Sequence, residues 1–393
     1  MNLDAADQTP GPSATRAVNL DVLRAVAALY VLAGHAYLLS GRAIGFHDRN
    51  PVRLFINTGG AGVWLFFALS GYLIAGPFVA RLLSGAPLPD LVGFARRRVL
   101  RIYPAYWLAF GAILAFGLRP GVTVSAKRFL VHAALLHNAV PGEQQALYFA
   151  SWTLSLEVLF YASLPVASWL LLRLRPGPIP PRVLIRCVVA AWCLSVVFVA
   201  VVPWAFTGSS RLWLRILYPS QLSMFCPGIM VAIAAHLDRS GQAPRWFTWL
   251  SEQRRCSLAI LGVLAVAGAV GATAAPLLVY DGSRQMFALA SGIVLVLAIT
   301  RPPLRRGGRL LTWLGVVSYG IYLWQGVIIY IVERHPGAIP LHGPGPVAYL
   351  VHVAYLMVLT VPMAWLSWRV IERPLIRVSR RRAEQKPFRA ATG

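Results

Sequence analysis

The first apolar segment of the chain, NLDVLRAVAALYVLAGHAY, carries three ionisable residues: Asp21, Arg24 and His35. On an α-helix, Arg24 and His35 lie about 20° apart around the axis and ~16 Å apart along it. Asp21 lies about 40° from His35, so the three side chains form one stripe. An imidazole can act as base and as acid near neutral pH, which makes His35 a candidate catalytic residue. In the alternative interpretation, His35 only hydrogen-bonds a neighbouring helix and Arg24 only extends its charge to the membrane surface.

A second candidate is Glu157, in the segment SWTLSLEVLFYASLP. It is the only acidic residue that we expect deep inside a membrane span, where a charge is costly and marks a functional site by default. We expect it at a depth similar to that of His35, where a carboxylate would orient the imidazole and raise its basicity. Alternatively, a protonated Glu157 hydrogen-bonds Tyr161 one turn along the helix. Trp152 and Tyr161 on this segment are candidate substrate-binding residues.

A third group of candidates is the arginine cluster in ARRRVLRIYPAYW. Arg98 and Arg101 are three residues apart and therefore share one helix face. Their planar guanidinium groups match the oxygens of a phosphate, so this face is a candidate binding site for a phosphorylated cofactor. For Arg96 and Arg97 we prefer the alternative, which is that they mark the cytoplasmic end of a membrane span.

The composition indicates what kind of scaffold must position these residues. Of the 393 residues, 58% are apolar and only 13% are charged, and the mean hydropathy is +0.63. An ordinary soluble domain has about twice as much charge, so a soluble enzyme is excluded. The formal net charge of +24 is explained by basic cytoplasmic loops at an anionic membrane surface, and we expect no nucleic acid partner. The cysteines show no CxxC or Cys/His spacing, so we expect no disulfide and no metal site.

We predict an all-α membrane bundle of about ten transmembrane helices. Every loop between spans that falls on the N-terminal side carries more basic residues than any loop on the other side, which predicts that both termini are cytoplasmic. We expect a polar N-terminus at 1–17, a transmembrane domain at 18–374 and a basic tail at 375–393, with a short interfacial helix at 128–139. The predicted spans are 18–40, 60–80, 99–118, 150–173, 183–204, 216–237, 256–280, 284–300, 311–332 and 347–371.

Six segments in this order resemble those of the family-3 membrane acyltransferases. They are LDVLRAVAALYVLAGHAY, GVWLFFALSGYLI, RRRVLRIYPAYW, SWTLSLEVLFY, LGVVSYGIYLWQ and WRVIERPL. The resemblance runs from about residue 19 to residue 377, which is nearly the whole chain.

The resemblance implies ten spans in the plasma membrane and transfer of an acyl group, usually acetyl, from acyl-CoA to a hydroxyl. The usual acceptors are sugars of envelope polysaccharides or glycolipids, or sugars on macrolide antibiotics. The family's Arg-x10-His pair falls on Arg24 and His35, its Arg-x-x-Arg on Arg98 and Arg101, and its acidic residue on Glu157. Acyl-CoA would be a co-substrate, with no permanently bound cofactor.

Two positions depart from the family pattern. Many relatives have a second acidic residue where this chain has Val158, and many have a histidine where it has Gln325. A transporter or flippase for an envelope lipid or glycan remains the competing interpretation. It would favour inverted repeats and discontinuous helices, which the sequence does not indicate.

Overall fold

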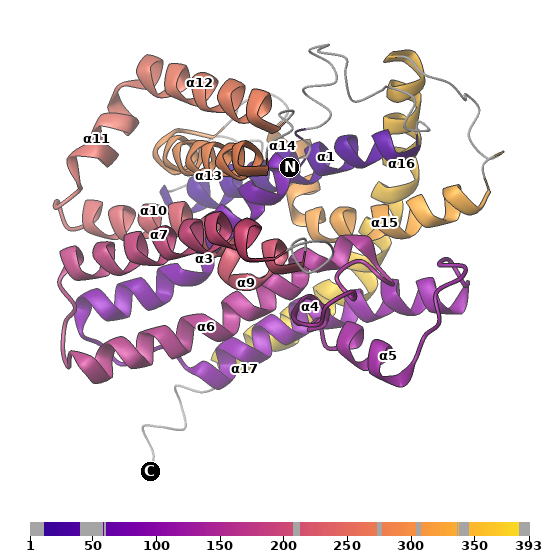
Figure 1. The fold of residues 1–393 in the computed structure, drawn as a ribbon. Helices are drawn as coiled ribbons and strands as arrows, with labels where there is room; N and C mark the ends of the chain where they lie inside the picture. The colour runs from indigo at the N-terminus through magenta and orange to yellow at the C-terminus, as the bar shows by residue number, and fades with distance from the viewer. Residues whose placement is uncertain are drawn as a thin grey trace, which may run out of the picture.

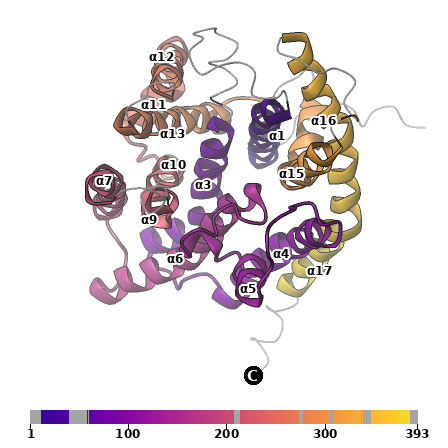
Figure 2. The ribbon, with the colours of Figure 1, turned by 45° about the vertical axis from the view of Figure 1, so that its right-hand side comes forward.

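A computed structural model describes residues 12–39, 58, 60–206, 213–272, 277–303, 308–335, 337 and 346–384. Its described elements are all helices, which confirms the predicted all-α class. Figures 1 and 2 show two of them, α1 (Pro12–Leu39) and α3 (Ala61–Ser84), at the centre of the bundle with the other helices around them.

Small residues allow the central helices to approach each other closely. A methyl group on Gly71 of α3 would lie 2.2 Å from the carbonyl oxygen of Phe225, and one on Gly62 would lie 2.5 Å from that of Ala27 in α1. Helices in a membrane associate mainly through such close packing, because lipid tails are as apolar as the helix surfaces. Both glycines therefore have a packing role.

The surrounding helices follow the predicted spans closely. The elements that correspond to predicted spans are α4 (Leu91–Ala115), α6 (Trp152–Leu174), α7 (Pro181–Ala205), α9 (Tyr218–Gln221) with α10 (Cys226–Asp238), α12 (Arg254–Ala272), α13 (Leu277–Thr300), α14 (Gly308–Val316) with α15 (Ser318–Arg334), and α16 (Pro346–Ser367). A short helix, α11 (Arg245–Glu252), precedes α12, and η5 (Trp368–Glu372) and α17 (Arg373–Glu384) follow α16. The basic tail therefore begins as a helix, and α1 begins at Pro12 rather than at residue 18.

Seven helices in the described ranges are long and apolar enough to cross a membrane, and up to nine if each of two bent pairs is one span. The helix α4, which corresponds to the predicted span 99–118, is not among them. It carries four arginines in its first half. The protein is thus a multi-pass membrane protein, while the number ten and the cytoplasmic position of both termini stay predictions.

Two of the predicted spans are broken, contrary to the expectation of continuous helices. The axis bends by 43° between 218–224 and α10, and by 67° between α14 and α15. Each break leaves backbone groups without their helical partners, and such breaks are tolerated in a membrane only where protein or a water-filled cavity surrounds them. Ser318, the first residue of α15, lies at the second break and lines the central pocket described below.

The predicted interfacial segment 128–139 forms α5 (Ala126–Ala133) and the short turn η1 (His137–Ala139). Three aromatic donors of α4 bind carbonyl oxygens at the end of α5. These are Tyr106 to His132 at 2.7 Å, Tyr103 to Ala134 at 2.9 Å and the indole of Trp107 to Ala133 at 2.9 Å. The last carbonyls of a helix have no partner within the helix, so these bonds anchor α5 to α4.

Charged contacts connect α5 with the loop that follows η1. Arg128 binds both carboxylate oxygens of Glu143, and His132 Nε2 lies 3.4 Å from the same group. The ring of His137 stacks on that of His132 with centroids 4.5 Å apart. The hydrogen bond with Arg128 lowers the pKa of Glu143, whereas burial lowers the pKa of His132 and, together with His132, the pKa of His137 to about 3.

These shifts predict that the protein loses stability in mild acid. An unfolded chain binds a proton on each histidine below pH ~6.5, whereas the folded protein resists this, so folding becomes less favourable as the pH falls through that value. The contribution of Glu143 is lost later, below pH ~4.3, because its pKa is lower in the folded state. We expect the melting temperature to be lower at pH 5 than at pH 7.5. In the variant with His132→Gln and His137→Gln the difference should be smaller, and an unchanged difference would contradict this explanation.

Candidate active site

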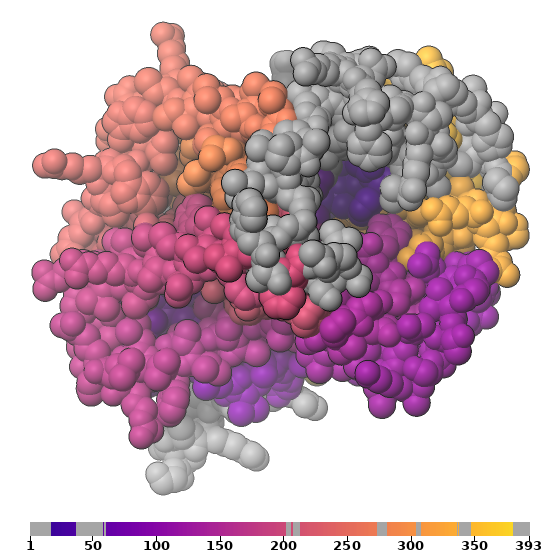
Figure 3. Space-filling view, in the orientation of Figure 1, coloured from indigo at the N-terminus to yellow at the C-terminus, as the bar shows by residue number. Residues whose placement is uncertain are grey.

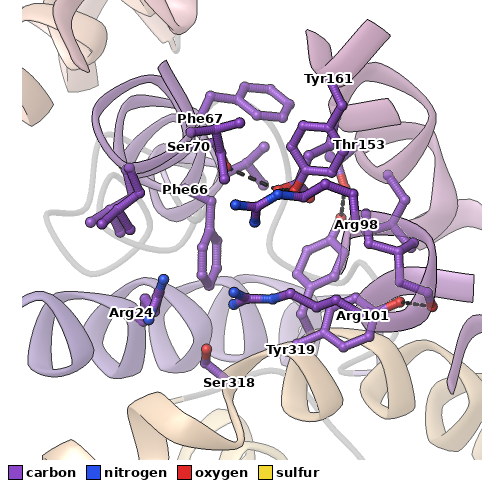
Figure 4. Close-up of a pocket in the computed structure, with 18 residues that line it drawn as sticks. Arg24, Phe66, Phe67, Ser70, Arg98, Arg101, Thr153, Tyr161, Ser318 and Tyr319 are labelled. Carbon is purple, nitrogen blue, oxygen red and sulfur yellow. Dashed lines mark hydrogen bonds between the residues drawn. The ribbon is translucent and has the colours of Figure 1, made fainter. Parts of the chain in front are cut away.

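A central pocket gathers charged and polar side chains from α1, α3, α4, α6 and α15 (Figure 4). This pocket, which we call the arginine pocket, has a volume of about 90 Å³. Its polar and charged lining residues are Arg24, Ser70, Arg98, Arg101, Thr153, Glu157, Tyr161, Ser318, Tyr319 and Tyr322. The guanidinium groups of Arg24, Arg98 and Arg101 point towards a common space in Figure 4. Three cations face one carboxylate there, so the pocket suits an anion.

On α1, Arg24 reaches this pocket while bonded to its own helix. Its Nη1 lies 2.6 Å from Oδ1 of Asp21, one turn earlier. Asp21 and Arg24 therefore lie on one face of α1, as the helical spacing predicts. The carboxylate holds the guanidinium in place and offsets part of the cost of desolvating it.

The two arginines of α4 have different neighbours. The guanidinium of Arg98 lies over the rings of Phe94 and Tyr161, at 5.5 and 5.3 Å from their centroids. Arg101 instead lies within electrostatic range of Glu372, a buried residue of the π-helical turn η5. Stacking restricts the side chain of Arg98, so less of its conformational freedom is lost when a ligand binds.

Glu157 lies among the arginines rather than beside the imidazole. Its carboxylate accepts a hydrogen bond from Ser70 at 3.0 Å and another from Tyr161. Its charge also acts on Arg24 and Arg98. The structure brings Glu157 and Tyr161 together, as one of the two interpretations expects, and it does not bring Glu157 to His35.

The imidazole of His35 lies outside the lining of the arginine pocket. It is half-buried, and the ring of Phe149 packs edge-on against it with centroids 5.1 Å apart. The polar side chain that the described residues bring to it is Gln325 of α15, which is fully buried. The side chain of Gln325 is close enough to act on His35, while neither Nδ1 of His35 nor Oε1 of Gln325 has a hydrogen bond.

Hydrogen bonds connect α15 with α6 at the arginine pocket. The hydroxyl of Tyr322 binds Thr153 at 2.7 Å and the carbonyl of Ala150 at 2.8 Å. Gln325 follows Tyr322 by one helical turn and donates to its carbonyl oxygen at 3.1 Å. Tyr322 and Thr153 both line the arginine pocket, whereas Gln325 acts on His35, so α15 connects the pocket with the surroundings of His35.

Of the two aromatic candidates, only Tyr161 lines the pocket. The ring of Trp152 packs edge-on against Phe67 with centroids 6.4 Å apart, and its carbonyl oxygen accepts a bond from Asn138 at 2.7 Å. Trp152 is thus positioned as a packing residue of the described structure. A role in binding the acceptor stays a prediction for it.

Several residues at or near the site escaped sequence reasoning. Among them, Ser70 was not a candidate, Gln325 was noted only as a departure from a pattern, and Glu372 lies just beyond the predicted last span. A signal for Glu372 was present, because an acidic residue that interrupts an apolar helix is costly. For Ser70 no signal existed, because a serine on a transmembrane helix bonds its own backbone as readily as a distant carboxylate.

Comparisons with known proteins agree with this geometry. The sequence profile of a family described as an acyltransferase domain matches residues 18–369. The exopolysaccharide production protein ExoZ of Rhizobium meliloti is 28% identical over 360 residues, which cover 86% of this chain and 96% of that protein. The O-acetyltransferase OatA of Staphylococcus aureus is 25% identical over 388 residues, covering 91% of this chain but 56% of OatA. No solved structure matches the chain.

The matched region contains the candidate residues from Arg24 and His35 on α1 to Gln325 on α15, but not Glu372. It also covers most of the described helices, including five of the seven that are able to cross a membrane on their own in full and the greater part of the other two. The chain therefore belongs to the family-3 acyltransferases, and it is a membrane-embedded acyltransferase.

Proposed function

We propose that the protein transfers an acyl group, in the first instance acetyl, from acyl-CoA to a hydroxyl of a carbohydrate. The observation that carries this proposal is the convergence of Arg24, Arg98 and Arg101 in one pocket. Of these, Arg24 belongs to α1, the helix that also bears His35. A membrane acyltransferase needs an anion site for its donor and a base for its acceptor, and α1 supplies a residue for each. We place the enzyme in the plasma membrane, where cytosolic acyl-CoA reaches the arginines.

The donor enters with its charged end at the arginines. Bidentate guanidinium groups bind phosphate oxygens well, and two arginines spaced one turn apart can hold one phosphate between them. The pocket of about 90 Å³ is small, so only part of CoA enters it and the nucleotide stays at its mouth. The pantetheine arm then extends along α1 for the ~16 Å between Arg24 and His35.

At His35 the reaction is general-base catalysis. The imidazole removes the proton from the acceptor hydroxyl while that oxygen attacks the thioester carbon, and the carbon–sulfur bond then breaks. The imidazolium returns the proton to the leaving CoA thiolate, so the ester and free CoA form with the enzyme unchanged. A transient acyl-imidazole is the alternative route through the same residue.

Glu157 acts on the donor side in this scheme. Its carboxylate lies within electrostatic range of Arg24 and Arg98 and is itself fixed by Ser70 and Tyr161. It therefore offsets the repulsion between these guanidinium groups while no donor is bound. The role of orienting the imidazole passes to Gln325, whose carboxamide is in reach of Nδ1. If Gln325 Oε1 accepts from Nδ1, Nε2 is free to serve as the base.

This assignment predicts a specific effect at Gln325. We expect Gln325→Leu to lower kcat by about tenfold or more, because the imidazole loses its orienting acceptor, while KM for acyl-CoA stays unchanged. Gln325→Glu should retain more activity and shift the acid limb of the kcat/KM profile to higher pH, because a carboxylate raises the basicity of His35. Trp324→Phe, which removes another buried polar group one residue away, is the matched control. Equal kcat in Gln325→Leu and the wild type would refute the assignment.

The acceptor is inferred from the relatives. ExoZ is named for exopolysaccharide production and OatA for O-acetyl transfer, which together favour the hydroxyl of an envelope polysaccharide or glycolipid. The chain spans about half the length of OatA, so the activity of that whole protein is not carried over. The sugar of a macrolide or of another secondary metabolite is the second choice of acceptor.

Binding of CoA distinguishes this function from lipid or glycan transport. A ligand that binds only the folded protein raises its melting temperature, by RT ln(1 + [L]/Kd) in free energy. We expect CoA and acetyl-CoA to stabilise the purified protein, and labelled acetyl-CoA to yield a labelled glycan in membranes that hold the enzyme. A flippase has no reason to bind CoA, so the absence of stabilisation and of label transfer would overturn the proposal.

A further inference from the structure

A second, larger cavity lies further along α3 and α6 than the arginine pocket, towards the C-terminal ends of both helices. It has a volume of about 410 Å³, within the range of small-molecule binding sites, and it shares no lining residue with the arginine pocket. Its walls are almost entirely apolar and come from α3, α6, α7, α9 and α10. Representative lining residues are Phe78, Phe160, Leu171, Val188 and Ile229. The hydroxyls of Ser163 and Tyr218 bind each other at 2.6 Å, so these two polar groups are satisfied.

The cavity opens between α6 and α7. These helices are consecutive in the chain, yet within the described residues they do not pack closely against each other. Figure 3 shows atoms of the early, indigo part of the chain at the bottom of a furrow between two magenta helices on the left. Outward-facing side chains on both helices are apolar and exposed, such as Val166, Leu170 and Leu194. Both helices are long and apolar enough to span a membrane, so the furrow opens to hydrocarbon.

One end of this furrow is strongly basic. The helices α3 and α6 end there, α7 begins there, and the backbone N–H of Ile179 binds the carbonyl of Leu82 at 2.8 Å to hold the ends together. The segments 81–86 and 173–186 contain five arginines and no acidic residue. These arginines are Arg81, Arg173, Arg175, Arg182 and Arg186, and all of them are exposed. The basic end lies on the side that the sequence analysis assigns to the cytoplasm.

We propose that the furrow between α6 and α7 is a binding site for an anionic glycerophospholipid. One acyl chain fills the apolar cavity, and the phosphate lies among the arginines at its basic end. Basic pockets between transmembrane helices bind anionic headgroups in this way. The lipid fills the space between α6 and α7, which do not pack closely against each other. It also contacts α3 and α6, the helices that carry Ser70 and Glu157. A zwitterionic lipid fits the cavity equally but leaves the arginine charge unbalanced.

Lipid-dependent melting of the detergent-purified protein tests this site. We expect phosphatidylglycerol to raise the melting temperature more than phosphatidylcholine with the same acyl chains, because a ligand of the folded state stabilises it in proportion to ln(1 + [L]/Kd). The double variant Arg182→Gln/Arg186→Gln should bind phosphatidylglycerol about tenfold more weakly or worse, since each arginine near a membrane surface contributes to anion attraction. The variant Arg254→Gln/Arg255→Gln, at the exposed start of α12, is the matched control and should behave as the wild type.

The cavity is tested separately from the headgroup site. The substitution Ala191→Phe places a ring in the cavity and should remove the stabilisation by lipid. Native mass spectrometry should find retained phosphatidylglycerol on the wild type and on the Arg254→Gln/Arg255→Gln protein, and less on the Arg182→Gln/Arg186→Gln protein. Equal stabilisation by the two lipids, or equal retention by both arginine variants, would overturn the proposal. Because all four arginines are exposed, neither double variant is expected to impair folding.

Discussion

Replacing His35 with alanine is expected to lower kcat for acyl transfer by a factor of about 10² to 10⁴, the usual contribution of a general base. The residue lies half-buried beside Phe149 and Gln325, with Nδ1 facing the protein interior. The Arg24 guanidinium lies in a separate pocket on the same helix, so acyl-CoA should bind the variant as it binds the wild type. Loss of kcat with unchanged donor affinity is the signature of a residue that acts on the reacting atoms.

The measurement is acyl transfer by purified protein at saturating acyl-CoA, together with donor affinity from thermal shift. His236→Ala is a suitable control, because His236 is also half-buried on a membrane-spanning segment and lies away from the pocket. Undiminished turnover of His35→Ala would eliminate the proposed mechanism. Full loss of donor affinity in that variant would instead place His35 in the donor site.

Removing Arg98 or Arg101 is expected to weaken acyl-CoA binding by about 10- to 100-fold each. A hydrogen bond to a charged group contributes about 1.5–3 kcal/mol, which corresponds to this range of dissociation constants. The side chain of Arg98 is restrained before the donor arrives by the rings of Phe94 and Tyr161, and Arg101 lies near Glu372. The measurement is the dissociation constant for CoA of Arg98→Ala and Arg101→Ala.

The neighbouring Arg97 supplies the control for this prediction. It shares the helix and the charge of Arg98 but does not line the pocket, so Arg97→Ala should change CoA affinity much less. Arg98→Lys separates charge from geometry, because lysine keeps the charge but lacks the planar fork. CoA affinity unchanged in both Arg98→Ala and Arg101→Ala would refute their role in docking the donor.

Several residue positions in the arginine pocket could be predicted from residue spacing alone. Arg98 and Arg101 were assigned to one helix face, and both line the pocket. Asp21 and Arg24 were assigned to one stripe, and their side chains form an ion pair. These predictions succeeded because the rise and rotation per residue of a helix are constant, so spacing along one helix fixes the relative positions of its side chains.

Contacts between residues on different helices were harder to predict from the sequence. Glu157 was expected at the depth of His35 from counting residues below the membrane surface, yet its partners are Ser70 and Tyr161 among the arginines. A depth count assumes straight helices perpendicular to the membrane. Helices tilt by about 20° on average, and in this protein two of the predicted spans also bend, by 43° and 67°.

The order of residues along the chain is enough to predict a helical membrane protein, the residue types that can do chemistry, and those that share a helix face. These properties follow from the hydropathy of the spans and from local backbone geometry. The packing of the helices was needed to show that Glu157 belongs with the arginines, that Gln325 lies near His35, and that a furrow lies between α6 and α7. The rotation and tilt of one helix against another depend on close packing at sites such as Gly62 and Gly71, where a single methyl group would separate the helices. No pattern within one segment contains that information.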